Sequence, residues 1–318
     1  MASVKILNKL CGQIQAGATY EDNAMIKLPF VSNRVNTSYD PIEDESVSGE
    51  GFKDIPQQGG RHVGVSGMSL QLDKISCIPI FEAAFGNNST RVFTLGGNAK
   101  KMSLCMLDSV NAVKYANMFL GSLTLSGSAN QKLMLSADLI GASIEDRAAT
   151  SAYPSDTPYD LPFVFQEMGG SNGYVRVGDA SDALVADNIK IEDFSIQIGS
   201  SFGEQFTNDG RGIETPVFGQ EGFPEISGSF TVASHTTDQW LQWEEDHTPL
   251  QMALLAYKDA TATVLIEIPR FVATVELTDD DKTKVKVDMK IGRNGTGTSY
   301  RNATMAFTSP VRVTVVNS

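Results

Sequence analysis

The stretch Phe119–Leu139, FLGSLTLSGSANQKLMLSADL, decides the predicted fold. Apolar residues alternate with small or polar residues in Ser122–Ser126 and again in Lys132–Leu139. This period of two places alternate side chains on opposite faces of a strand. The run Ser126–Asn130 between the two segments is rich in small residues that favour turns. The stretch is therefore predicted to form a β-hairpin with one apolar face.

A second copy of this pattern follows 152 residues later, where Phe271–Ile291 aligns with the hairpin without a gap. Five leucines of the first copy fall on apolar residues of the second: Leu123 on Val275, Leu125 on Leu277, Leu133 on Val285, Leu135 on Val287 and Leu139 on Ile291. Four further segments match in the same order at offsets of 163, 161, 150 and 148: Ile26–Leu28 with Ile189–Ile191, Val65–Gly67 with Ile226–Gly228, Met102–Leu104 with Met252–Leu254, and Pro162–Phe165 with Pro310–Val313. The shared order predicts a tandem duplication.

The duplication predicts four parts of the chain. They are an N-terminal arm (1–19), a first repeat (20–167), a Gly-rich linker (168–182) and a second repeat (183–318). Alternation predicts strands in both repeats, and only Ile80–Phe85 and Asp238–Glu245 have a helical pattern. The chain is therefore predicted to be mainly β, with one short helix in each half.

Each repeat also contains a long Gly-rich stretch of poor periodicity, residues 36–64 in the first and 200–222 in the second. Loops of this length in a compact domain are usually functional. Their recurrence at the same place predicts a shared role.

The balance of charged residues argues against some classes of function. Lys and Arg total 25 against 38 Asp and Glu, which gives a net charge of −13 and a pI of about 4.7. This balance argues against a protein that grips nucleic-acid phosphate or docks on anionic lipid. No apolar run approaches 18 residues, and Met1–Leu10 is too polar for a signal peptide. We expect a soluble protein made in a cytoplasm, without membrane contact.

The three cysteines, Cys11, Cys77 and Cys105, lie far apart and form no CxxC pair. The pattern fits neither a disulfide framework nor a zinc site, so we expect three thiols in a reducing compartment.

No catalytic pattern stands out. The three histidines are His62, His235 and His247, and a Ser-His-Asp arrangement of His235 with Asp238 lacks a Gly-x-Ser-x-Gly elbow. Neither zinc-hydrolase nor phosphate-loop motifs occur, and the acidic runs lack the spacing of a calcium loop. The chain is therefore predicted to be neither an enzyme nor a cofactor or metal binder. Its pattern favours a structural protein.

The order of elements in each half is a strand, a long Gly-rich loop, a strand with Val/Ile-Ser-Gly (Val65–Gly67 and Ile226–Gly228), a short helix, a strand and a terminal hairpin. Over residues 20–318 this order resembles the major tail tube proteins of long-tailed, siphovirus-like bacteriophages, in a tandemly duplicated form. The resemblance implies two tandem tail-tube-like β-sandwich or barrel domains, whose strands join those of adjacent subunits in an inner barrel. It implies trimeric, pseudo-hexameric rings that stack into a conduit for DNA ejection.

The resemblance also implies partners and a location. The partners are other copies of the chain, a tape-measure protein, a tail terminator and tail-tip proteins, while double-stranded DNA passes without specific binding. The location is the virion tail, assembled in the bacterial cytoplasm. A capsid decoration protein, another virion surface protein and a carbohydrate-binding adhesin are the alternatives.

Two groups of residues follow as candidate sites. The ring-stacking candidates lie in the two long loops: Glu43, Asp44, Glu45, Phe52, Phe206, Asp209, Arg211 and Phe218. The candidates for a face toward the lumen or a subunit joint are the polar positions of the two hairpins: Ser122, Thr124, Ser136, Asp138, Thr274, Glu276, Lys284, Lys286, Asp288 and Lys290. The three lysines fit a channel for DNA poorly. They are expected either to pair with carboxylates of a neighbour or to lie on a face away from the channel.

Overall fold

The computed structural model describes residues 9–17, 19–42, 57–95, 100–107, 111–169, 172–184, 189–199, 202–205, 217–220, 225–233, 237–277, 284–292, 305 and 307–316. The first half contains β1 (Lys9–Gln15), β2 (Ile26–Lys27), β3 (Phe30–Ile42), β4 (Gln57–Gln71), α1 (Cys77–Phe85), β5 (Gly86–Ser89), β6 (Val92–Leu95), β7 (Lys101–Leu107), β8 (Asn111–Ser128), β9 (Met134–Ala149), and the short 3-10 helices η1 (Thr150–Ala152) and η2 (Phe165–Met168). The second half contains β10 (Tyr174–Asp179), β11 (Ile191–Gly199), β12 (Phe202–Gln205), β13 (Val217–Gln220), β14 (Ile226–Ala233), α2 (Thr237–Glu245), β15 (Leu250–Asp259), β16 (Ala262–Leu277), β17 (Lys284–Ile291) and β18 (Arg312–Val316).

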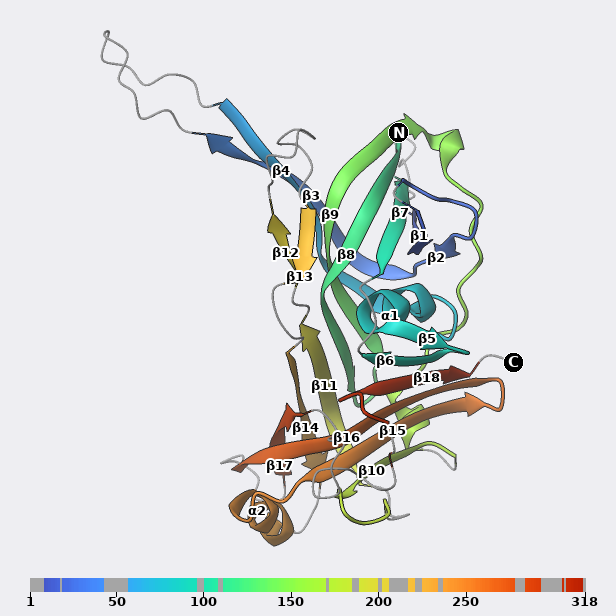
Figure 1. The fold of residues 1–318 in the computed structure, drawn as a ribbon. Coiled ribbons are helices and arrows are strands. Elements are labelled where there is room, and N and C mark those ends of the chain that lie inside the picture. The colour runs from blue at the N-terminus through green and yellow to red at the C-terminus, as the bar shows by residue number, and fades with distance from the viewer. Residues whose placement is uncertain are drawn as a thin grey trace, which may run out of the picture.

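The fold is mainly β, as predicted, and sixteen strands of the described residues belong to one sheet (Figure 1). In the first half, antiparallel pairing follows the order β1-β7-β8-β9-β4-β3. In the second half it follows the order β10-β15-β16-β17-β14-β11. The two halves therefore pair their strands in the same sequence of steps. Each set also has one helix between its third and fourth strands along the chain, α1 after β4 and α2 after β14.

Two strand pairings join the halves. β11 pairs with the second part of β8, from Ser122↔Gly199 to Ser128↔Asp193. The last strand, β18, pairs with β16 on one side and with β6 of the first half on the other. The halves are consequently not separate sheets, because the ladder continues from one to the other.

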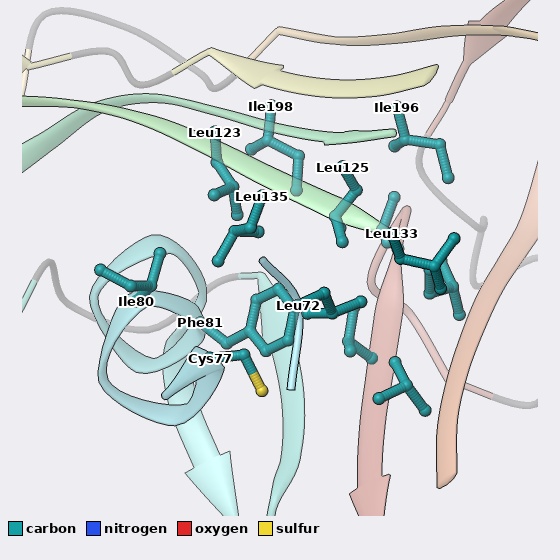
Figure 2. Close-up of a cluster of buried hydrophobic side chains, with 14 of the residues drawn as sticks. Leu72, Cys77, Ile80, Phe81, Leu123, Leu125, Leu133, Leu135, Ile196 and Ile198 are labelled. Carbon is teal, nitrogen blue, oxygen red and sulfur yellow. The ribbon is translucent and has the colours of Figure 1, made fainter. Parts of the chain in front are cut away.

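Helix α1 covers the apolar face of this sheet where the halves meet. Its Ile80 and Phe81 are fully buried and belong to one cluster with apolar side chains from three strands and two connecting segments (Figure 2). The labelled partners are Leu123 and Leu125 of β8, Leu135 of β9, Ile196 and Ile198 of β11, and Leu72 and Leu133 beside them. Burying one such side chain contributes about 1.5–3 kcal/mol, so this shared core holds β11 of the second half to the first.

Helix α2 covers the second half through its tryptophans. Trp240 is fully buried and its ring lies edge-on to that of Phe230, with 5.6 Å between centroids. Phe230 in turn contacts the ring of Phe271 of β16, and the ring centroids of Trp243 and Trp240 are 5.0 Å apart. Trp240 therefore belongs to the core, and the partly buried Trp243 packs against it. Both predicted helices are present.

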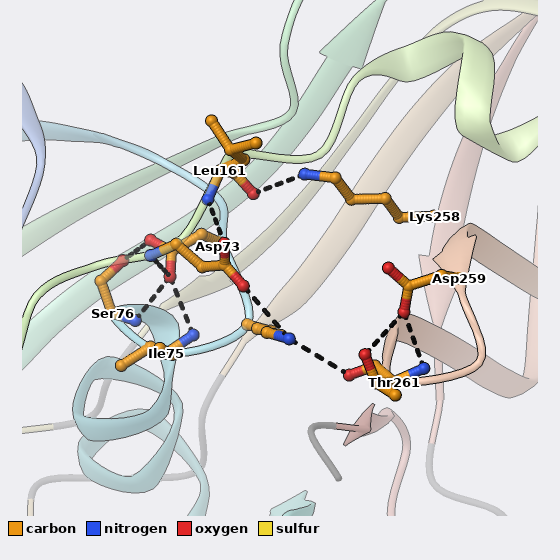
Figure 3. Close-up of polar contacts among 9 residues, drawn as sticks. Asp73, Ile75, Ser76, Leu161, Lys258, Asp259 and Thr261 are labelled. Atoms are coloured by element: carbon orange, nitrogen blue, oxygen red, sulfur yellow. Dashed lines mark hydrogen bonds and ion pairs between the residues drawn. The ribbon is translucent and has the colours of Figure 1, made fainter.

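A polar cluster ties the start of α1 to the second half (Figure 3). The buried carboxylate of Asp73 accepts hydrogen bonds from the backbone N–H groups of Ile75 and Ser76 and from the Ser76 hydroxyl. The neighbouring Lys74 forms a 3.1 Å ion pair with Asp160 and reaches toward the backbone oxygen of Thr261, 3.5 Å away, in the β15–β16 turn.

A second lysine continues this cluster. Lys258 donates to the backbone oxygen of Leu161 at 3.2 Å. Asp259 accepts from the backbone N–H and the hydroxyl of Thr261, which closes the β15–β16 turn. Segment 160–161 thus lies between the two halves and contacts both.

Four regions for which the sequence predicted no strands contain them. The predicted N-terminal arm includes β1, and the predicted linker includes β10, whose Val175 and Val177 alternate with polar residues in a segment flanked by glycines. The predicted loop 36–64 is β-paired at both ends, because residues 36–42 and 57–64 lie in β3 and β4. The predicted loop 200–222 likewise contains the pair β12–β13. Residues 36–42, 57–64, 202–205 and 217–220 lack a clear alternation of apolar residues, so periodicity missed the strands in the two long loops.

Candidate functional site

The ten residues predicted for the lumen or subunit joint lie on a single face of the sheet. Directly opposed residues of antiparallel strands point to the same face. In the first hairpin Ser122 opposes Asp138 and Thr124 opposes Ser136. In the second hairpin Thr274 opposes Asp288 and Glu276 opposes Lys286. Lys284 and Lys290 share the face of Lys286, since they are an even number of residues away on β17.

Strands β11 and β14 connect these two groups. Thr124 opposes Gln197, which opposes Ser227, which opposes Lys290. A continuous polar face therefore crosses β9, β8, β11, β14, β17 and β16, on the side opposite the apolar core. We call this the polar face.

Sequence reasoning left out the central residues of the polar face: Asp193, Ser195, Gln197, Ser227, Ser229 and Thr231. A pattern that predicts strands was nevertheless present in the sequence. Apolar and polar residues alternate in Phe194–Ile198, and serines occupy every second position in Ile226–Phe230. What the sequence did not show was that these strands lie between the two hairpins.

Lysines on the polar face pair with carboxylates of the same chain. Lys284 forms a 3.0 Å ion pair with Glu192, and Lys286 forms one of 3.3 Å with Glu276 and one of 3.7 Å with Asp288. The hydrogen bond to Glu276, followed by the nearby charge of Asp288, raises the pKa of Lys286. Pairing with a neighbour's carboxylates, one of the two sequence-based expectations, is therefore not needed for Lys284 and Lys286.

Asp138 anchors the first hairpin at this face. Its carboxylate accepts a 2.6 Å hydrogen bond from the Ser122 hydroxyl and a 2.7 Å bond from the backbone N–H of Gly67. Gly67 has φ +61°, in the left-handed region that favours glycine, and lies at a register shift between β4 and β9. Asp138 therefore holds an irregular part of β4 against the β8–β9 hairpin.

Most of the ring-stacking candidates lie outside the described residues. These are Glu43, Asp44, Glu45, Phe52, Phe206, Asp209 and Arg211. The backbone of Phe218 lies in β13, opposite Glu204 of β12. Figure 1 shows the β3–β4 hairpin, which leads to the first group, extending away from the rest of the sheet.

Among the strand edges without a described partner, two belong to β16 and β3. Phe271 of β16 opposes Leu250 of β15 and Ile291 of β17, so β15 and β17 lie on opposite edges of β16. Beyond Phe271, residues 272–277 pair with β17 but have no described partner on the β15 edge. Strand β3 pairs with β4 and has no described partner on its other edge.

In the described ranges, no three His, Cys, Asp or Glu side chains gather in a way that could hold a metal ion. Within the same part of the chain, no helix combines the length and apolarity needed to cross a membrane. His247 is exposed, His235 lies outside the described residues, and the side chain of His62 is not described.

A mainly antiparallel sheet, a continuous polar face and open strand edges place the chain among β-rich proteins. A family model described as "Phage tail tube protein" matches residues 16–309, which is 294 of the 318 residues. The chain belongs to this family of tail tube proteins, which are structural proteins of the virion tail. A search of curated proteins found no match. The predicted family is confirmed, whereas the siphovirus type, the tandem duplication and the domain limits remain predictions.

Proposed function

We propose that copies of this chain join edge to edge into closed rings that stack as a tail tube, through which DNA is ejected. The observation that carries this proposal is the pairing of β11 with β8 inside one chain. The two strands of this internal joint, β11 and β8, have counterparts in β3 and β16. These counterparts are the strands that the chain leaves with open edges.

The repeated pairing order supports a tandem duplication behind this arrangement. β3 holds the position in the first half that β11 holds in the second, and β8 corresponds to β16. The edge of β8 that β11 occupies is the β7 edge, because β9 takes the other. Its counterpart in β16 is the β15 edge, which is open over residues 272–277. Pairing β16 with β3 of a second copy would therefore repeat the internal joint.

Apolar side chains at the open edges support this joint. At the offset of 152, Leu277 corresponds to Leu125, yet Leu277 is 47% exposed and Leu125 is 1% exposed. At the offset of 163, Val31 corresponds to Phe194, and their exposed fractions are 60% and 2%. The apolar side chains that the internal joint buries thus have exposed counterparts at the open edges of β3 and β16. Covering half a leucine side chain would contribute about 1 kcal/mol to each joint.

Head-to-tail joints of this kind form a ring when their rotation closes. Two joints per chain, one internal and one between chains, give six similar joints in a ring of three chains. Closure also removes strand edges that would otherwise promote aggregation. We therefore favour trimeric, pseudo-hexameric rings.

The polar face is assigned to the lumen, since α1 and α2 cover the opposite face. Small hydroxyl side chains dominate its centre and two of its lysines are paired with carboxylates, so it offers few free cations to DNA phosphate. DNA would pass without specific binding. The β3–β4 and β12–β13 hairpins, with the ring-stacking candidates, would contact the next ring. Tape-measure, terminator and tail-tip proteins complete the proposed assembly in the host cytoplasm, and no catalytic role is proposed.

Proline substitutions at neighbouring positions of β16 test the joint. Successive residues of a strand direct their N–H groups to opposite edges, and proline removes that group. Of Thr274→Pro and Val275→Pro, one should break pairing with β17 and lower the Tm. The other should leave the fold intact by circular dichroism but abolish the stacked rings that we expect concentrated wild-type protein to form in negative stain.

Rings formed normally by both proline variants would contradict this joint. Wild-type protein that stays monomeric at every concentration would contradict self-assembly and favour a capsid decoration protein.

A further inference from the structure

Two of the three cysteines face each other across neighbouring strands. Cys11 of β1 is directly opposite Cys105 of β7, although the residues are 94 positions apart in the sequence. Directly opposed residues of antiparallel strands have Cα atoms about 4.5–5.5 Å apart. A disulfide spans Cα separations of about 4.4–6.8 Å, so the backbone already suits a bond between them.

The two thiols are also in contact. Both cysteines are fully buried, and Cys11 Sγ lies 3.7 Å from the backbone oxygen of Cys105, to which it donates. A hydrogen bond between the thiols lowers the pKa of Cys105 and raises that of Cys11. Cys105 is therefore the thiol that ionises first, with the Cys11 S–H beside it.

The surroundings separate this pair from the main core. Cys11 and Cys105 form a small cluster with Met25 and Ala112, against which Tyr20 and Tyr153 pack. Cys77 lies elsewhere, in the main core at the start of α1, and burial raises its pKa well above the usual value. The chain thus contains one cysteine pair and one isolated cysteine, which serves as an internal control.

We propose that Cys11 and Cys105 form a cross-strand disulfide when folding, or a transient opening of β1, exposes them to a low-molecular-weight disulfide outside a reducing environment. The Cys105 thiolate attacks the small disulfide, which forms a mixed disulfide and releases one small thiol. The Cys11 thiolate then attacks the Cys105 sulfur and releases the second small thiol. Two electrons pass from the cysteines to the oxidant, and the two protein protons end on the released thiols.

The bond would fasten β1 to β7 near one end of the sheet. It would close a loop of more than ninety residues, which restricts the unfolded chain strongly. It would link no separate chains, so it adds stability to each subunit whether or not rings form. This inference is independent of the proposed joint between subunits.

Refolding in a glutathione redox buffer tests the proposal, because it gives the oxidant access to thiols that are buried in the native state. Full-length protein is refolded with oxidised and reduced glutathione, or with a reductant only, then unfolded and labelled with N-ethylmaleimide. Before labelling, the expected product is 2 Da lighter than the reduced protein. After labelling it carries one label per chain instead of three, and it yields a Cys11–Cys105 linked peptide. Its Tm should exceed that of the reduced protein by about 5–10 °C.

Variants make the result specific. Cys77→Ala should form the same bond, whereas Cys105→Ala should form none and should keep the Tm of its reduced form in both buffers. Three labels per chain in folded, refolded wild-type protein would overturn the proposal. So would a disulfide that includes Cys77, or an oxidised form that melts below the reduced form.

Discussion

The buried ion pair between Glu267 and Arg312 should be among the more costly contacts to break. Arg312 of β18 donates from Nε to Glu267 Oε2 at 2.6 Å and from Nη2 to Oε1 at 2.8 Å. Glu267 of β16 is 8% exposed, and the guanidinium also lies 4.1 Å from the ring centroid of Phe307. Since β18 also pairs with β6, this contact supports the strand that connects the C-terminal end of the sheet to the first half.

The substitution Arg312→Met removes the charge and both hydrogen bonds while it keeps most of the apolar stem. An exposed ion pair contributes about 0–1 kcal/mol, whereas breaking a buried pair costs about 3–5 kcal/mol. The Glu267 side chain is 11% exposed and that of Arg312 31%, which places this pair between the two cases. We therefore expect a loss of about 2–3 kcal/mol, because the carboxylate stays buried without its partner.

Urea unfolding of unassembled protein, followed by the fluorescence of Trp240 and Trp243, measures this loss. With an m-value of about 3 kcal/mol per molar urea, the midpoint should fall by about 1 M. The double variant Glu267→Gln/Arg312→Met removes both charges and should recover more than half of the loss. Lys286→Met, which breaks an exposed pair, should leave the midpoint nearly unchanged. A midpoint within 0.2 M (roughly the error of the method) for Arg312→Met, or no recovery in the double variant, would refute the reasoning.

Two further predictions concern the contacts between the halves. The pKa values of Asp160 and Asp259 are lowered, the first mainly by the backbone N–H of the next residue and the second by a threonine hydroxyl, so the stability they add is present above about pH 4 and is lost as the pH falls below it. The Tm difference between wild type and Asp160→Asn/Asp259→Asn should therefore be constant above pH 5 and should disappear as the pH falls below 4. A Tm difference that persists at pH 2 would contradict this. A Cβ at Gly173 would lie 1.8 Å from the backbone oxygen of Glu167, so Gly173→Ala should destabilise the fold by about 2 kcal/mol or more in urea unfolding, whereas Gly178→Ala, whose Cβ would meet its nearest atom at 4.0 Å, serves as the control and should cost much less.

The sequence by itself determined the elements whose pattern is local. Alternation over Phe119–Leu139 and Phe271–Ile291 identified both hairpins and which of their faces is polar. The helical spacing of Ile80–Phe85 and Asp238–Glu245 identified both helices. These predictions succeed because the period of apolar residues depends on backbone geometry within one element. The order of matching segments also indicated two similar halves before any pairing was known.

Only the tertiary structure decided which strands are neighbours. The pairing of β11 with β8, the place of β18 beside β6, and the meeting of Cys11 with Cys105 all join residues that are distant in the sequence. Local periodicity carries no information on such partners, because every strand edge offers the same backbone donors and acceptors. The partner is selected by the packing of whole faces, here by α1 over β8, β9 and β11. This choice of neighbouring strands places the polar side chains on one continuous face and brings its lysines beside carboxylates. It also leaves β3 and β16 with the open edges on which the proposed ring depends.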